Sequence, residues 1–317
     1  MWVFDPLLHR CSTGAPDMLS SVFFRAMLVW SGLVCLACLP HALALPALAE
    51  NEQLLHVDSG ETISPSDLLQ ALNQADVSAW GEVHDNPRHH ALRAELLRAI
   101  KARRVTIVAE HMDAGKQVDP RLALPDALGQ AGFDAPAWQW PLHQVLFEAV
   151  QQAGLAFYGG NLPASQTREV YKSQGSSASS ELQHLLRNAP LEEASLKQLR
   201  QEIDEGHCSA LPAHMFDAMI AVQRARDASM ASVLLQHLPS VLLAGNGHAW
   251  KHVGVPQIIR ANQPDLRVVS LLLLEHAPFS TRAESTQWLQ NWRGKADFIW
   301  LTPTRTRDDP CKQFQKK

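Results

Sequence analysis

Residues 77 to 84 read VSAWGEVH, a short apolar run that leads at once into Gly, Glu and His. A similar order occurs twice more, in VTIVAEH at residues 105 to 111 and in VLLAGNGH at residues 241 to 248. Each run has the length of a buried strand, and helical patterns lie between the runs. This alternation predicts an α/β fold, with a parallel sheet that is flanked by helices on both faces.

The pattern divides the chain into a core, a lobe and two terminal segments. Strands are expected at residues 77 to 83, 105 to 110, 155 to 159, 240 to 245, 267 to 274 and 297 to 301. Residues 165 to 238 contain several helical stretches and no convincing strand, which favours a smaller all-helical insertion lobe. The α/β core would then comprise residues 50 to 164 and 239 to 303. A polar, mobile tail would follow at residues 304 to 317.

The amino terminus resembles a secretory signal. Residues 26 to 49 contain no Asp, Glu, Lys or Arg, and the run ends at two Ala-Leu-Ala sites. We expect residues 1 to 49 to be a signal peptide with an upstream extension, translated from Met18 and cleaved after Ala49. The run is also long enough to be an uncut membrane anchor. If the segment is a cleaved signal peptide, the protein is exported and is periplasmic or associated with the envelope.

The cysteines give weaker signals. Cys38 follows Cys35, Leu36 and Ala37, a poor match to a lipoprotein signal, so a lipid anchor is only weakly indicated. Cleavage after Ala49 would leave Cys208 and Cys311, which allow one disulfide or two unpaired thiols.

The formal net charge is -4 and the chain has no basic stripe, which excludes nucleic acid as a partner.

The residues that follow the strands are the candidates for a ligand site. The carboxyl ends of parallel strands share one edge of the sheet, where such folds bind their ligands. The candidates at this edge are Glu82, His84, Glu110, Asn161, Asn246 and His248. Glu82 and His84 are two positions apart and point to the same side of an extended chain, where they can share a proton or bind a metal.

The other strand ends differ in how strongly their residues indicate a ligand site. Glu110 and His111 are adjacent and face opposite ways on a strand, and we choose Glu110 as the one that faces the cleft. Asn161 follows two glycines that allow a ligand close to the backbone, although a plain turn also explains it. The Gly-Asn-Gly sequence around Asn246 predicts a tight exit that delivers His248 at the start of a helix.

Four polar residues next to the first strand end have simpler explanations. Asp85 and Asn86 precede Pro87, where they are expected to cap the helix that follows. His89 and His90 fall in the first turn of that helix, and either can be a solvated surface residue. None of the four therefore indicates a site by itself.

Six motifs together carry a resemblance to a known family. They are GEVHDNPRHH at 81 to 90, VAEH at 108 to 111, GGNLPAS at 159 to 165, GHCSALP at 206 to 212, QRARDASMA at 223 to 231 and AGNGHAWKHVGVP at 244 to 256. In this order they resemble the ChaN family of haem-binding, iron-regulated envelope proteins. That family belongs to the superfamily of the Tiki and TraB proteins and the erythromycin esterases. The resemblance implies a parallel sheet flanked by helices, with a smaller helical domain.

The resemblance also implies a cofactor and partners. Haem would be bound as a cofacial pair at the contact of two protomers, through a tyrosine ligand, and the protein would work with the haem-uptake machinery of the envelope. The chain has two tyrosines, and we favour Tyr171 over Tyr158, for which a core position is the simpler explanation. No CxxCH motif is present, so the haem would be a non-covalent b-type haem.

A hydrolase is the alternative function. Glu82, His84, Glu110 and His248 resemble the acid and histidine set of the Tiki and esterase relatives. A histidine would then act as a base or as a ligand of a divalent metal, and a glutamate would activate water. The chain has neither an HExxH helix nor a serine elbow, so a binding protein is favoured over a catalyst. A third reading is a non-catalytic envelope scaffold.

Overall fold

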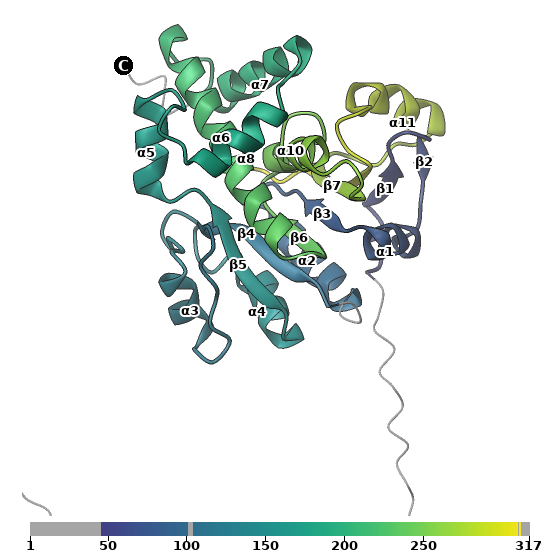
Figure 1. Ribbon diagram of the computed structural model, residues 1–317. Coiled ribbons are helices and arrows are strands. Elements are labelled where there is room, and N and C mark those ends of the chain that lie inside the picture. Colours follow the sequence, from purple (N-terminus) through teal and green to yellow (C-terminus); the bar gives the residue numbers. More distant parts are fainter. Residues whose placement is uncertain (1–45, 101–103, 310, 312–317) are drawn as a thin grey trace, which may run out of the picture. The chain divides into compact units, whose positions relative to one another are not determined.

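The computed structural model describes residues 46 to 309 and Cys311, with a gap at residues 101 to 103 (Figure 1). The predicted leader, apart from its last four residues, lies outside the described residues, as does Cys38. Within the described ranges, no helix combines the length and the apolar character needed to cross a membrane.

The described residues form one eight-stranded sheet in the order β2-β1-β8-β7-β3-β6-β4-β5. The strands are β1 (Gln53–His56), β2 (Glu61–Thr62), β3 (Val77–Trp80), β4 (Thr106–Asp113), β5 (Ala156–Asn161), β6 (Ser240–Leu243), β7 (Val268–Glu275) and β8 (Phe298–Thr302). The six strands from β8 to β5 pair in parallel, which confirms the predicted α/β class. The antiparallel edge of β1 and β2 was not predicted, because both strands are short and β2 is exposed.

Helices cover both faces of this sheet (Figure 1). They are α1 (Pro65–Gln74), α2 (Pro87–Ala99), α3 (Leu124–Gln130), α4 (Gln144–Ala153), α5 (Ala164–Lys172), α6 (Ser180–Asn188), α7 (Glu193–Gly206), α8 (Phe216–Gln236), α9 (Asn246–Ala249), α10 (Val255–Asn262) and α11 (Arg282–Leu289), with 3-10 turns at Ala213–Met215 and Gln290–Trp292. Helices α1 to α4 contribute to one apolar core. Helices α5 to α8, α10 and α11 contribute to the other.

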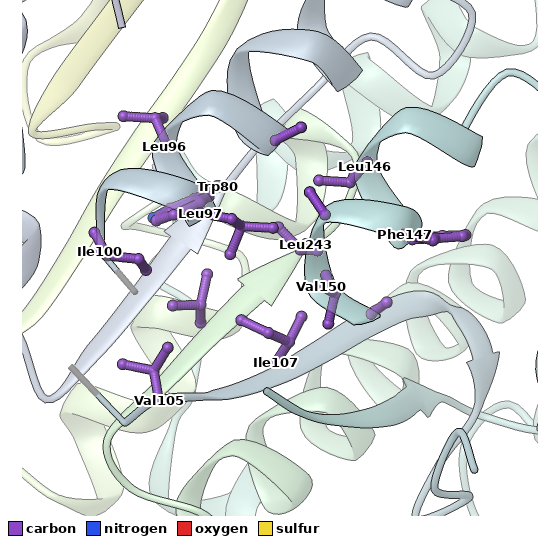
Figure 2. Packing of buried hydrophobic residues seen from close by; sticks show 14 of the residues in the cluster. Trp80, Leu96, Leu97, Ile100, Val105, Ile107, Leu146, Phe147, Val150 and Leu243 are labelled. Carbon is purple, nitrogen blue, oxygen red and sulfur yellow. The ribbon is translucent and has the colours of Figure 1, made fainter. Parts of the chain in front are cut away.

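The strands divide their side chains between these two cores. Trp80, Ile107 and Leu243 belong to the core under α2 and α4, whereas their neighbours Ala79, Val108 and Leu242 belong to the core under α8. All six are essentially inaccessible to solvent. Figure 2 shows the first core, where these three side chains lie among Leu96 and Leu97 of α2 and Leu146, Phe147 and Val150 of α4. The near-continuous apolar strands therefore reflect burial on both faces.

The exit from β3 is shaped by a local cap. The Asn86 side chain accepts hydrogen bonds from the backbone N–H groups of Arg88 and His89, and Pro87 occupies the first position of α2. The predicted capping role of Asn86 is confirmed. Asp85 instead pairs with Arg307 of the tail.

The described part of the tail is held in place, unlike the mobile segment that we predicted. Arg307 donates hydrogen bonds to both carboxylate oxygens of Asp85 and of Glu275, at the carboxyl edge of the sheet. Cys311 then forms a disulfide with Cys208, which follows α7 in the helical region. The ion pairs of Arg307 and the disulfide of Cys311 thus anchor a segment that its polar composition predicted to be mobile.

Candidate functional site

Four of the predicted site residues lie together at the carboxyl edge of β3, β4 and β6. His84 joins the two carboxylates, with Nδ1 2.9 Å from Oε1 of Glu82 and Nε2 3.9 Å from Oε2 of Glu110. The other oxygen of Glu110 lies 3.3 Å from Nε2 of His248. The His84 side chain keeps 45% of its accessible surface, whereas the other three residues are buried. His84 is therefore the member of the set that solvent reaches.

Glu82 is fixed from the side of α2. Its Oε2 lies 2.9 Å from Nδ1 of His90 and contacts the guanidinium of Arg93. Both partners are completely buried. The nitrogen Nε2 of His90 also lies 2.9 Å from the backbone oxygen of His84. These contacts leave Oε1 of Glu82 directed at His84 and its neighbours.

Two further histidines face the same carboxylate. Nε2 of His111 and Nε2 of His143 lie 3.4 and 3.5 Å from Oε1 of Glu82. The Trp138 ring covers His111 at a centroid distance of 4.3 Å. Burial lowers the pKa of His143 to about 2 and holds the pKa of His111 well below its usual value. Both imidazoles are thus neutral at neutral pH.

A second buried network lies on the α8 side of the edge. Nδ1 of His248 is 2.6 Å from Oδ1 of Asp227, and its other nitrogen faces Glu110. Burial alone would lower the pKa of His248, but the two carboxylates raise it to about 10. Burial also opposes ionisation of Glu110, yet His248 and nearby histidines hold the pKa of Glu110 well below its usual value. His248 is therefore a charged imidazolium between two carboxylates.

The exit from β6 explains why glycine precedes Asn246. Gly245 donates its N–H to Oε2 of Glu110 at 2.8 Å and forms the amino-terminal cap of α9. A Cβ on Gly245 would lie 2.7 Å from Nε2 of His84, so the His84 ring would have to move. The Asn246 amide donates to the backbone oxygen of Leu273 and so ties this turn to β7. The short helix places His248 as the glycine pattern predicted.

An open cavity of about 320 Å³ adjoins these networks. Its lining residues are Glu110, His111, Met112, Asp113, Gly132, Ala137, Trp138, Asn161, Leu162, Ala164, Thr167 and Arg226. Two polar atoms in this set, Oδ1 of Asn161 and Nε of Arg226, are buried and lack a hydrogen-bond partner among the described residues. The cavity thus combines apolar side chains with an amide and a guanidinium in its lining, as ligand sites do.

The two tyrosines occupy different surroundings. Tyr171 lies on α5, one helical turn beyond the cavity-lining Thr167, and is half-buried against the lobe. Tyr158 lies within β5, and its ring stacks on His237 at a centroid distance of 4.3 Å. His237 immediately follows α8, at the end where the chain enters β6.

Two expectations about this edge are wrong. Glu110 faces the α8 side and His111 the α4 side, as the alternation predicts, yet both line the cavity, so Glu110 is not the one residue of the pair that reaches it. His89 and His90 are buried rather than solvated. His89 accepts the N–H of Val83 and contacts the hydroxyl of Thr302.

Sequence reasoning also missed Asp227, His143 and Trp138. Asp227 stands in the quoted QRARDASMA motif, so its position in the family pattern was a signal that we did not use. His143 and Trp138 lie in the segment before α4 and have no motif around them. Only the fold brings that segment against the end of β4.

A sequence profile described as "Haem-binding uptake, Tiki superfamily, ChaN" matches residues 68 to 259. The chain belongs to this family. The match spans β3 to β6 and includes every residue of the two networks described above. No curated protein matches the sequence significantly.

One solved structure shares the fold of this chain. ChaN of Campylobacter jejuni, described as binding haem cofacially, superposes with a TM-score of 0.65 at 20% sequence identity, over 80% of this chain and 98% of that chain. A Bacillus cereus protein has a TM-score of 0.44 at 11% identity, over 79% of this chain and 95% of its own. The first likeness shows the fold.

Proposed function

We propose that this protein binds haem and takes part in haem or iron uptake. The observation that carries the proposal is the family match over residues 68 to 259. The cavity beside Glu110 is the place that we assign to the haem, because it has both apolar walls and free polar atoms.

The side chains around the cavity suit a haem. Ala137 and Trp138 offer apolar surface for the macrocycle. The buried Nε of Arg226 has no partner among the described residues, and a propionate carboxylate is the partner that a guanidinium binds best. The haem would supply an iron centre that accepts a protein ligand.

Tyr171 is the iron ligand that we propose. It follows Ala164 and Thr167 at spacings of seven and four residues on α5, so the three share one face of the helix. Tyr158 is less suitable, because its ring is stacked on His237. A phenolate at Tyr171 would hold the haem at the rim of the cavity.

The size of the cavity supports binding between two copies of the chain. A volume of about 320 Å³ lies at the lower end of the range for ligand pockets, roughly 300 to 1,000 Å³, and the cavity is open. A haem placed there would keep one face exposed. A second protomer with its own haem would cover that face, which gives a homodimer with non-covalent b-type haem at the interface.

Export to the envelope is part of the proposal. The uncharged run that ends at Ala49 supports a cleaved leader, and the Cys208–Cys311 disulfide suits an oxidising compartment such as the periplasm. Sequencing the amino terminus of the protein from envelope fractions tests this part. A mature end near Glu50 is expected, and a chain that retains Met18 contradicts cleavage.

Haemin titration tests the binding function. Added haemin is expected to give a saturable Soret shift with one haem per chain. Sedimentation of the same sample is expected to show a monomer that becomes a dimer as haem binds. Haemin that stays free in solution would contradict the proposed function, whereas binding without dimerisation would contradict only the interface.

Hydrolysis is a second candidate, favoured by the Asp227, His248 and Glu110 network beside solvent-accessible His84. Buried groups with strongly shifted pKa values are frequent in catalytic sites. His84 would be the group that exchanges protons with water or substrate, since it alone of the four is exposed. Turnover of ester or amide substrates that is lost in His84→Gln would support this candidate.

A further inference from the structure

We propose that Glu82, His84, His111 and His143 bind a divalent transition-metal ion. One donor atom from each of these residues lies within 4.8 Å of the others. The residues come from the exit of β3, the end of β4 and the residue that precedes α4. This set differs from the four residues of the hydrolase hypothesis, because His111 and His143 replace Glu110 and His248.

The distances in the cluster suit a tetrahedral ion. Oε1 of Glu82 lies 2.9, 3.4 and 3.5 Å from a ring nitrogen of His84, His111 and His143. Zinc binds nitrogen and oxygen ligands at about 2.0 to 2.2 Å, which places tetrahedral donors ~3.3 Å apart. The three distances from the carboxylate oxygen lie around this value. The donor atoms of the three imidazoles lie within 4.8 Å of one another, so an ion would draw these side chains closer together.

The buried histidines have few other partners. Both ring nitrogens of His111 are buried and make no hydrogen bond to any described residue, and the buried ring of His143 has only a backbone contact at Trp138 besides Glu82. Each residue is no more than 2% exposed. Leaving such atoms unsatisfied costs free energy, and nearly all buried polar groups in native proteins have a partner. A metal ion would satisfy one nitrogen of each ring at once.

The surroundings orient the carboxylate. Arg93 and His90 hold the other oxygen of Glu82, which leaves Oε1 as the atom that faces the three imidazoles. Such outer contacts commonly fix the ligands of a metal centre. Trp138 covers the cluster on the cavity side, with its ring 5.1 Å from His84 and 4.3 Å from His111. The site is therefore shielded and still reachable past the half-exposed His84.

The donor set indicates the class of ion. Imidazoles with one carboxylate suit Zn²⁺, Fe²⁺, Co²⁺ or Ni²⁺, whereas Mg²⁺ and Ca²⁺ require mainly oxygen ligands. The inference needs neither haem nor hydrolysis. It concerns an ion held on the α2 and α4 side of the sheet edge, while the haem is assigned to the cavity in front of Trp138.

Metal titration of the purified, chelator-treated protein tests this inference. We expect one Zn²⁺ per chain, and we expect Co²⁺ to give the visible absorption bands of a tetrahedral complex, displaced by Zn²⁺. His111→Gln and His143→Gln should each weaken Zn²⁺ binding by about 100-fold or more, since even the loss of an outer contact costs 10 to 100-fold. The exposed His184 lies on α6 and gives the matched control, His184→Gln, which should bind as the wild type does.

Three results would overturn the proposal. They are the absence of stoichiometric Zn²⁺ and Co²⁺ binding, unchanged binding in both glutamine variants, and loss of the ion in His248→Gln instead. If neither Zn²⁺ nor Co²⁺ binds, water would be the partner of the buried histidines. If a glutamine variant fails to fold, the Co²⁺ spectrum of the wild type still decides between imidazole ligation and none. A Soret titration of the zinc-free protein with haemin tests haem binding separately. Failure of the metal proposal is thereby distinguished from failure of the proposed haem-binding function.

Discussion

Oε1 of Glu110 lies 3.3 Å from Nε2 of His248, although α3 to α8 separate the two residues in sequence. The opposite nitrogen of His248 contacts Asp227, so the imidazole is enclosed by two carboxylates. This network joins β4 to the long helix α8 through the exit of β6. It is therefore a structural bond across the carboxyl edge as well as a part of the candidate site.

Stability should fall as His248 loses its proton. The pKa of His248 is about 10 in the folded protein and about 6.5 when unfolded, so its contribution is complete below pH 6.5 and disappears as the pH rises to 10. We expect the free energy of unfolding to decrease on the order of a few kcal/mol over this range. Urea unfolding at successive pH values measures the change. An equal pH dependence in His248→Gln would show that the histidine is not its source.

Gly245→Ala should disturb the site, whereas Gly247→Ala should not. The new Cβ would lie 2.7 Å from Nε2 of His84, while a Cβ at Gly247 meets nothing within 4 Å. We expect the first variant to displace the His84 ring from Glu110 at little cost in stability, because this half-exposed side chain can move away. The second should leave the ring in place. The imidazole signals of His84 in NMR spectra check both variants, and an unchanged His84 signal in Gly245→Ala would contradict the close approach.

The sequence predicted the central strands because they are buried on both faces and read as apolar runs. It could not reveal β1 and β2, which are too short to form a pattern and depend on pairing with β8. The candidate edge followed from topology, since parallel strands must bring Glu82, Glu110 and His248 to one side. His143 reaches the same place through the packing of α4, which leaves no trace in local sequence.

The surroundings of a side chain were harder to predict than its position. Alternation along a strand assigned Glu110 to the cleft and turned His111 away. The two side chains do face opposite sides, Glu110 toward His248 and His111 toward Phe147, but both line the cavity at the end of β4. Similarly, His89 and His90 in the first turn of α2 gave no sign of burial, because they are covered by β8 and by Glu82.

Arg93→Met should destabilise the protein far more than Arg98→Met in the same helix. Arg93 is completely buried against Glu82, whereas Arg98 is exposed. Removing one partner of a buried ion pair typically costs about 3 to 5 kcal/mol, and an exposed substitution stays within about 0.5 kcal/mol. Thermal and urea unfolding measure the difference. Equal effects would mean that Arg93 does not hold the carboxylate of Glu82.

Loss of the disulfide should weaken the attachment of the tail. The bond closes a sequence separation of 103 residues, and removing a native disulfide of this kind costs about 2 to 5 kcal/mol. We expect the double variant Cys208→Ser with Cys311→Ser to unfold at a lower urea concentration. We also expect the backbone amide of Arg307 to exchange its hydrogen faster in this variant. The same unfolding midpoint for variant and wild type, both under non-reducing conditions, would contradict a stabilising bond.

Haemin titration of three matched proteins tests the central claim, that this chain binds haem through Tyr171 beside the cavity of Glu110 and Arg226. The wild type and Tyr158→Phe are expected to show the same saturable Soret shift and the same phenolate spectrum. Tyr171→Phe should lose that spectrum and bind haemin about tenfold or more weakly, a loss of ~1.4 kcal/mol or greater. An unchanged spectrum in both tyrosine variants would contradict the assignment of Tyr171 as the iron ligand. A wild type that leaves the Soret band of free haemin unaltered would contradict haem binding by this chain.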